Sequence, residues 1–178
     1  MEKLYYHLPQ LAAVRDFFEL GGDVLFLIGL LTLVMWTLIL ERMMYFTLRY
    51  PQVAREAVAA WESRRERISW HAHQVRLYLI SSVAQQLERN MMLIRTCVAL
   101  CPLMGLLGTV TGMIEVFEVM AISGSGNPRS MAAGVSKATV PTMAGMVAAL
   151  SGVAMSAWLQ RKVIRERDLL GEHMTMDH

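Results

Sequence analysis

The sequence contains few charged residues for its length. Charged side chains make up 18% of the 178 residues, whereas ordinary soluble domains carry about 25%, and 54% of the residues are hydrophobic. This deficit of charge argues against a soluble globular enzyme. The formal net charge is only +2, so no overall excess of positive charge favours nucleic acid as a partner.

Motifs for metal binding and catalysis are also scarce. Cys97 and Cys101 lie four residues apart in an apolar run, which matches neither a disulfide framework nor a zinc motif, so we expect reduced thiols. His71 and His73 lack further Cys or His neighbours in sequence, which favours a solvated pair over a metal site. No phosphate-binding glycine loop, Ser/His/Asp arrangement or paired-carboxylate site is present. We expect no cofactor and no enzymatic activity.

Three long uncharged runs dominate the sequence instead. They extend over Val24–Leu40, Thr96–Ile114 and Ala138–Gln160. The first reaches about 25 Å as a helix before Tyr45 and Phe46 extend it, and the others are longer. The sequence therefore predicts an all-α integral membrane protein with three transmembrane helices.

The distribution of Lys and Arg predicts the orientation of these helices. Eight arginines lie in the segment from Thr47 to Arg95, and four basic residues follow Gln160 closely. The N-terminal segment and the segment at 121–130 carry few basic residues. Because basic segments stay in the cytoplasm, the N-terminus is predicted outside and the C-terminus inside, with cytoplasmic helical extensions. The predicted segments are a periplasmic amphipathic segment (1–22), a first span (23–46), a cytoplasmic helical hairpin (47–94), a second span (95–120), a periplasmic loop (121–130), a third span (131–160) and a cytoplasmic tail (161–178).

Small residues recur at helical spacing in the second and third spans. Such stripes let helix backbones approach closely in lipid, where van der Waals packing replaces the hydrophobic drive. The helix-packing candidates are Gly105, Gly108, Gly112, Gly145, Gly152 and, as a possible helix bend, Pro141.

Hydroxyl side chains within these spans allow two interpretations. Thr109 and Thr111 lie in the second span and Thr142 in the third, and a hydroxyl can both donate and accept along a water chain. Each could instead bond a carbonyl of its own helix. Pro141 removes the amide that would bond the carbonyl of Lys137, which leaves polar backbone near Thr142.

Ionisable residues stand only near the ends of the spans. Glu41 and Arg42 are interpreted as interfacial anchors, and Glu115, Glu118 and Lys137 are candidate charges at the outer mouth of a pore. No carboxylate lies deep in any of the three uncharged runs. If the protein moves protons, a partner is expected to supply the titrating group.

Two blocks of the sequence resemble a known family. CPLMGLLGTVTGMIEVF at 101–117 is similar to the second-span signature of the ExbB/TolQ/MotA proton-channel family, and AGVSKATVPTMAGMVAAL at 133–150 resembles the third span of its ExbB-type members. The resemblance implies a homo-oligomer, usually a pentamer, around the helices of an ExbD-like single-span dimer. Such a complex of the bacterial inner membrane uses proton-motive force to drive a TonB-like energy transducer.

The resemblance also carries residue roles and departures. It places Thr109 and Thr142 at the two pore-facing threonine positions and implies a titrating Asp on the partner. Lys137 stands where relatives usually have an acidic residue, and Ser151 where they often have proline. A TolQ-like role in envelope maintenance, a flagellar-type stator and a purely structural membrane scaffold remain the alternatives.

Overall fold

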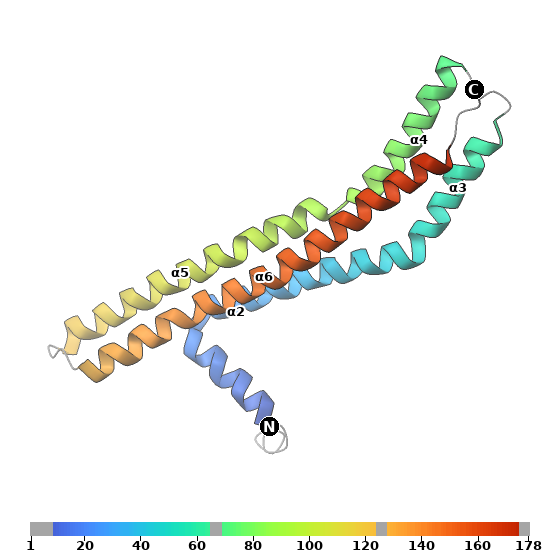
Figure 1. Cartoon of the computed structure of the whole chain (residues 1–178). Coiled ribbons are helices and arrows are strands. Elements are labelled where there is room, and N and C mark those ends of the chain that lie inside the picture. Colours follow the sequence, from blue (N-terminus) through green and yellow to red (C-terminus); the bar gives the residue numbers. More distant parts are fainter. Residues whose placement is uncertain (1–8, 65–68, 124–127, 175–178) are drawn as a thin grey trace. The chain divides into compact units, whose positions relative to one another are not determined.

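Helices account for all regular secondary structure in the described residues of the computed structural model, which are 9–64, 69–123 and 128–174. The predicted all-α class is confirmed. In chain order (Figure 1) the elements are α2 (Pro9–Met44), a π-helical turn η1 (Tyr45–Arg49), α3 (Tyr50–Glu62), α4 (Trp70–Glu88), α5 (Met91–Ser123) and α6 (Pro128–His173).

Three helical stretches are long and apolar enough to cross a membrane, as predicted. They fall within Gly22–Glu62, Trp70–Ile122 and Gly134–His173. Large apolar side chains stand exposed on their surfaces, such as Phe26 at 65% and Leu150 at 68%, which suits contact with lipid or with other subunits. The orientation of the spans and the boundaries of the seven segments stay predictions. Helix extends into both ends of the loop predicted at 121–130, since α5 continues to Ser123 and α6 begins at Pro128. Residues 124–127 lie outside the described residues.

A glycine bends α2 just ahead of its apolar run. Gly22 has φ 63° and ψ −161°, a conformation that a side chain would oppose. The helix therefore changes direction at Gly22, two residues before the uncharged run begins at Val24.

The π-helical turn η1 has its cause in Pro51. Proline has no backbone N–H and its ring crowds the carbonyl four residues earlier, which here belongs to Thr47. The backbone N–H of Tyr50 bonds the carbonyl of Tyr45, five residues back, so the turn is widened immediately before the proline.

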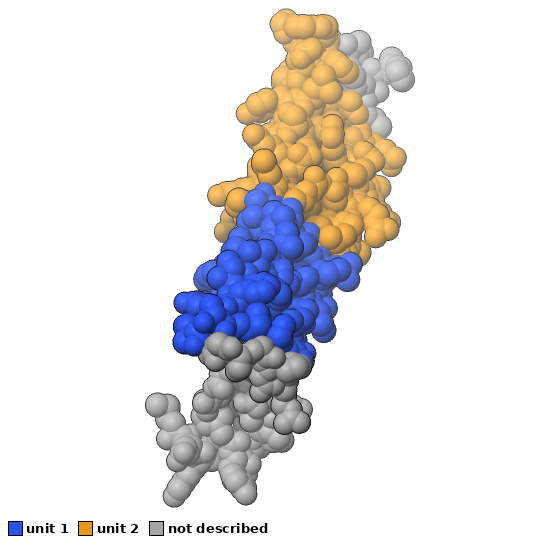
Figure 2. All heavy atoms as spheres, turned by 90° about the vertical axis from the view of Figure 1, so that its left-hand side faces the viewer, with its two compact units in different colours: residues 1–35, 96–151 blue, residues 36–95, 152–178 orange. Residues whose placement is uncertain are grey.

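The chain forms two compact units, coloured separately in Figure 2. One comprises residues 1–35 and 96–151, and the other residues 36–95 and 152–178. In the first unit, Cys101 of α5 packs with Ala148 and Ala149 of α6, and Leu31 of α2 covers them. Because Cys101, Ala148 and Ala149 have small side chains, α5 and α6 lie close together here.

The second unit joins the hairpin of α3 and α4 to the end of α6. Ser69 caps α4 by accepting a hydrogen bond from the Ala72 amide at 3.2 Å, and Trp61, at the end of α3, is buried. The hydroxyl of Tyr50 donates to the Glu166 carbonyl of α6 at 3.1 Å. Arg76 of α4 donates to two carbonyls at the C-terminal end of α6. Polar contacts thus fix three helices to one another.

Candidate functional site

The predicted pore residue Thr142 joins two helices of the first unit. Its hydroxyl donates to the carbonyl oxygen of Gly105 on α5 at 2.8 Å. A Cβ added to Gly105 would lie 3.0 Å from the Thr142 Cα, which is tighter than most Cβ contacts, so glycine allows this approach without displacing the backbone of α6. The hydroxyl oxygen still has lone pairs with which to accept a hydrogen bond.

The other glycines of α5 lie along the same contact. A Cβ at Gly108 would come within 2.9 Å of the Pro141 Cγ, and one at Gly112 within 2.7 Å of the Ala138 Cβ. On α6, a Cβ at Gly145 would come within 2.5 Å of the Cys101 carbonyl oxygen. The two helices therefore meet through backbone and small side chains. Gly152 is buried and belongs to the second unit.

Pro141 occupies the space that Gly108 leaves open. The helix α6 continues through this proline, whose ring is fully buried against α5. Pro141 cannot donate to the carbonyl of Lys137, so that carbonyl lacks its usual helical partner next to Thr142.

The threonines of α5 behave differently from Thr142. Thr109 donates to the carbonyl of Leu106 in its own helix at 2.7 Å. Thr111 donates to the Leu107 carbonyl at 3.0 Å and to the Gly108 carbonyl at 3.2 Å. The two interpretations left open by the sequence thus divide between residues: the hydroxyls of Thr109 and Thr111 bond their own helix, and the hydroxyl of Thr142 bonds the neighbouring helix.

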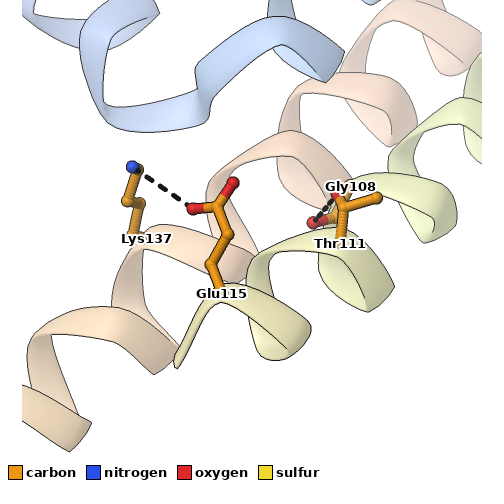
Figure 3. A network of polar contacts seen from close by, with 4 residues as sticks. All are labelled: Gly108, Thr111, Glu115 and Lys137. Atoms are coloured by element: carbon orange, nitrogen blue, oxygen red, sulfur yellow. Dashed lines mark hydrogen bonds and ion pairs between the residues drawn. The ribbon is translucent and has the colours of Figure 1, made fainter. Parts of the chain in front are cut away.

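Two of the three candidate mouth charges lie together (Figure 3). The Lys137 ammonium is 3.7 Å from a carboxylate oxygen of Glu115, and their side chains are 45% and 64% exposed. A cavity of about 270 Å³ beside the pair is also lined by Asp23 of α2 and Thr111. The remaining candidate, Glu118, is exposed. Lys137 therefore stands beside a carboxylate of its own chain, which partly offsets its charge.

The structure holds charged residues whose positions the sequence did not reveal. Arg42, interpreted as an interfacial anchor, is 2% exposed and donates to the Gln86 carbonyl at 3.0 Å. Its guanidinium also lies over the Tyr45 ring, 5.2 Å from the centroid. No sequence signal identifies this role, because it depends on how α4 packs against α2.

The metal candidates gain no support. His71 lies against the Trp70 ring with centroids 5.3 Å apart. In the parts of the chain that the structure describes, no group of three His, Cys, Asp or Glu side chains is arranged to hold a metal. Cys97 and Cys101 are unpaired thiols.

The structure is that of a helical membrane protein with three apolar helices. Two of these helices, α5 and α6, meet through glycines, and the hydroxyl of Thr142 lies between them. Residues 52–171 match the model of the MotA/TolQ/ExbB proton channel family, and since this is more than half of the chain, the protein belongs to that family.

Curated relatives agree with this membership. The chain is 29% identical over 175 residues to a biopolymer transport protein of Synechocystis sp. named ExbB-like 1, which covers 80% of this chain and 69% of that protein. It is 36% identical over 85 residues to the biopolymer transport protein exbB1 of Vibrio cholerae, covering 45% of this chain and 37% of that protein. The predicted resemblance to ExbB-type members is confirmed.

Proposed function

We propose that this chain is an ExbB-like subunit of the bacterial inner membrane with no enzymatic activity of its own. With an ExbD-like single-span dimer it forms a motor that uses proton-motive force and energises import through TonB-dependent outer-membrane receptors. Membership of a proton channel family and two relatives named as biopolymer transport proteins support this function. The proposed assembly is a homo-oligomer, a pentamer by analogy with the family.

The observation that carries the proposal is the hydroxyl of Thr142. It stands inside a span, donates to a carbonyl of a second helix and keeps acceptor capacity for a water or for the acid proton of a carboxyl group. The uncharged runs offer no carboxylate of their own. This combination supports a channel wall that orders water or meets a titrating group, with the group itself on the partner.

Proton flux in liposomes tests the proposal. The chain alone is expected to dissipate an imposed pH gradient slowly, and addition of the single-span partner is expected to raise the rate, because the partner contributes the titrating carboxylate. Liposomes that hold only lipid and liposomes that hold only the partner provide the controls. Equal rates with and without the partner would contradict the proposed division of roles.

A purely structural scaffold is the alternative that one observation favours. The hydroxyls of Thr109 and Thr111 in α5 are held by their own helix, and the hydroxyl of Thr142 connects two helices. A scaffold would assemble with the partner but conduct no protons, so the same flux measurement separates the two functions. A TolQ-like or flagellar-type role would conduct, and it would be separated by which single-span protein co-purifies with the chain.

A further inference from the structure

A groove in the second unit combines an apolar wall with charges of both signs. It has a volume of about 480 Å³, and its residues come from the end of α4, the start of α5 and the neighbouring part of α6. Figure 1 shows the course of these three helices. Its lining includes Glu88, Met92, Arg95, Gln160, Val163 and Ile164. None of these residues belongs to the proposed proton path, so the groove calls for a separate explanation.

A break in the backbone forms the groove. The helix α4 ends at Glu88, Arg89 is extended with ψ 137°, and Asn90 has φ 62°. The Asn90 side-chain amide donates to a carboxylate oxygen of Glu41 at 3.0 Å, and its carbonyl accepts from the Ile94 amide at 3.1 Å as α5 begins. The break is therefore held from both sides. It brings Glu88 of one helix and Arg95 of the next to the same groove.

The groove stands where two spans end. Arg95 immediately precedes the uncharged run of α5, and Gln160 closes that of α6. Two residues further along α6, the Lys162 ammonium lies 5.3 Å from the ring centroids of both Trp158 and Phe46. Aromatic rings and lysines gather at the membrane–water boundary, so this part of α6 is at headgroup level.

The groove presents two charged side chains, Glu88 and Arg95, next to an apolar surface. Glu88 and Arg95 are both exposed, and within the described ranges neither is held in an ion pair. Met92 is 81% exposed and Ile164 is 51% exposed, which provides an apolar surface next to the two charges. A guanidinium suits a phosphate, a carboxylate suits an ammonium, and the apolar wall suits a hydrocarbon chain.

We propose that this groove binds a phospholipid with a primary ammonium in its headgroup, that is, phosphatidylethanolamine. Arg95 holds the phosphate, Glu88 accepts hydrogen bonds from the ammonium, and an acyl chain covers Met92 and Ile164. A quaternary choline headgroup has no N–H to donate to Glu88, and a glycerol headgroup leaves the carboxylate facing an anionic lipid without a cation. The site selects among phospholipids independently of the proposed motor function.

Native mass spectrometry of the full chain in detergent tests this selectivity. The protein is incubated with equimolar phosphatidylethanolamine, phosphatidylcholine and phosphatidylglycerol with matched acyl chains, and the retained lipid is counted. The wild type is expected to retain phosphatidylethanolamine about fivefold over the other two, the scale of one partly exposed ion pair. Glu88→Gln is expected to bring the ratio over phosphatidylcholine to about one, whereas Arg95→Gln is expected to lower retention of all three lipids.

Further variants make the test specific. Glu88→Lys is expected to shift the preference towards phosphatidylglycerol, because positions 88 and 95 are then both positively charged. Glu172→Gln and Arg161→Gln change charges on α6 outside the groove and are expected to keep the wild-type pattern. Circular dichroism confirms that each variant is folded. Equal retention of the three lipids by the wild type, or an unchanged preference in Glu88→Gln, overturns the proposal, and so does an oligomer in which a second copy covers the groove and excludes lipid.

Discussion

The Thr142 hydroxyl and the Gly105 carbonyl form a hydrogen bond of 2.8 Å between α6 and α5. The bond exists because glycine at 105 leaves the backbone of α5 open to a side chain of α6. Close packing and polar chemistry are therefore parts of one feature here. A change to the packing moves the hydroxyl, and a change to the hydroxyl loosens the packing only a little, since such a bond in a membrane contributes about 0.6 kcal/mol on average.

Replacement of Gly108 is expected to disturb this contact strongly. A Cβ at this position would meet the buried Pro141 ring, so Gly108→Leu forces α5 and α6 apart at a cost of about 1–3 kcal/mol or more. Heat resistance of the detergent-extracted oligomer measures the loss. Leu106→Met on the exposed side of α5 is the matched control and is expected to have little effect. Unchanged heat resistance in Gly108→Leu would contradict the packing described.

The outer ion pair is expected to contribute little to stability. Glu115 and Lys137 are both more than a third exposed, so their 3.7 Å pair is worth less than about 1 kcal/mol. Lys137→Met should leave thermal stability nearly unchanged. If the pair lies at the mouth of the proton path, the same variant changes the rate of proton flux, and the exchange Glu115→Lys with Lys137→Glu restores it. A large stability loss with unaltered flux would make the pair a structural contact.

Asn90 is expected to accept glycine better than a β-branched residue. Its φ of 62° costs most side chains about 1–2 kcal/mol, a cost from which glycine is free. Asn90→Gly loses the hydrogen bond to Glu41 but gains backbone freedom, so the two effects roughly cancel. Asn90→Val is expected to lower stability by about 2 kcal/mol or more, because a β-branched residue opposes the left-handed conformation. Denaturant unfolding in detergent compares the two, and equal stability would contradict the role of the left-handed residue.

Arg76 is expected to fix the end of α6 to α4. Its guanidinium donates to the carbonyls of Gly171 at 2.7 Å and Met174 at 2.5 Å, which complements the negative end of the helix. Arg76→Gln should cost about 1.5–3 kcal/mol, the scale of hydrogen bonds from a charged group. Arg76→Lys should recover part of this, because lysine keeps the charge but loses the planar fork. Arg165→Gln, on an exposed position of α6, is the control, and proteolysis of the C-terminal end reports the loosening.

Sequence patterns predicted the helices but not the contacts between them. The uncharged runs predicted three spans because hydrocarbon thickness sets their length, and the glycine spacing predicted a small-residue face on α5. The acceptor of Thr142 depends on the register between α5 and α6, which no local pattern specifies. The burial of Arg42 likewise depends on α4, which begins 28 residues later in the chain.

Substitution of Thr142 separates a functional hydroxyl from a structural one. Thr142→Val keeps the shape of the side chain and removes donor and acceptor, so the packing against Gly105 survives and the oligomer should still assemble. If the hydroxyl orders water or meets the carboxyl group of the partner, Val should abolish partner-dependent iron–siderophore uptake in cells, and Thr142→Ser should retain much of it. Thr109→Val is the comparison within α5, where the hydroxyl is held by the Leu106 carbonyl. Co-purification of the partner with each variant shows that assembly is intact. If the hydroxyl only joins two helices, its bond is too weak for its loss to stop transport, and uptake should stay near normal with Val at position 142. That result would remove the hydroxyl from the proton path.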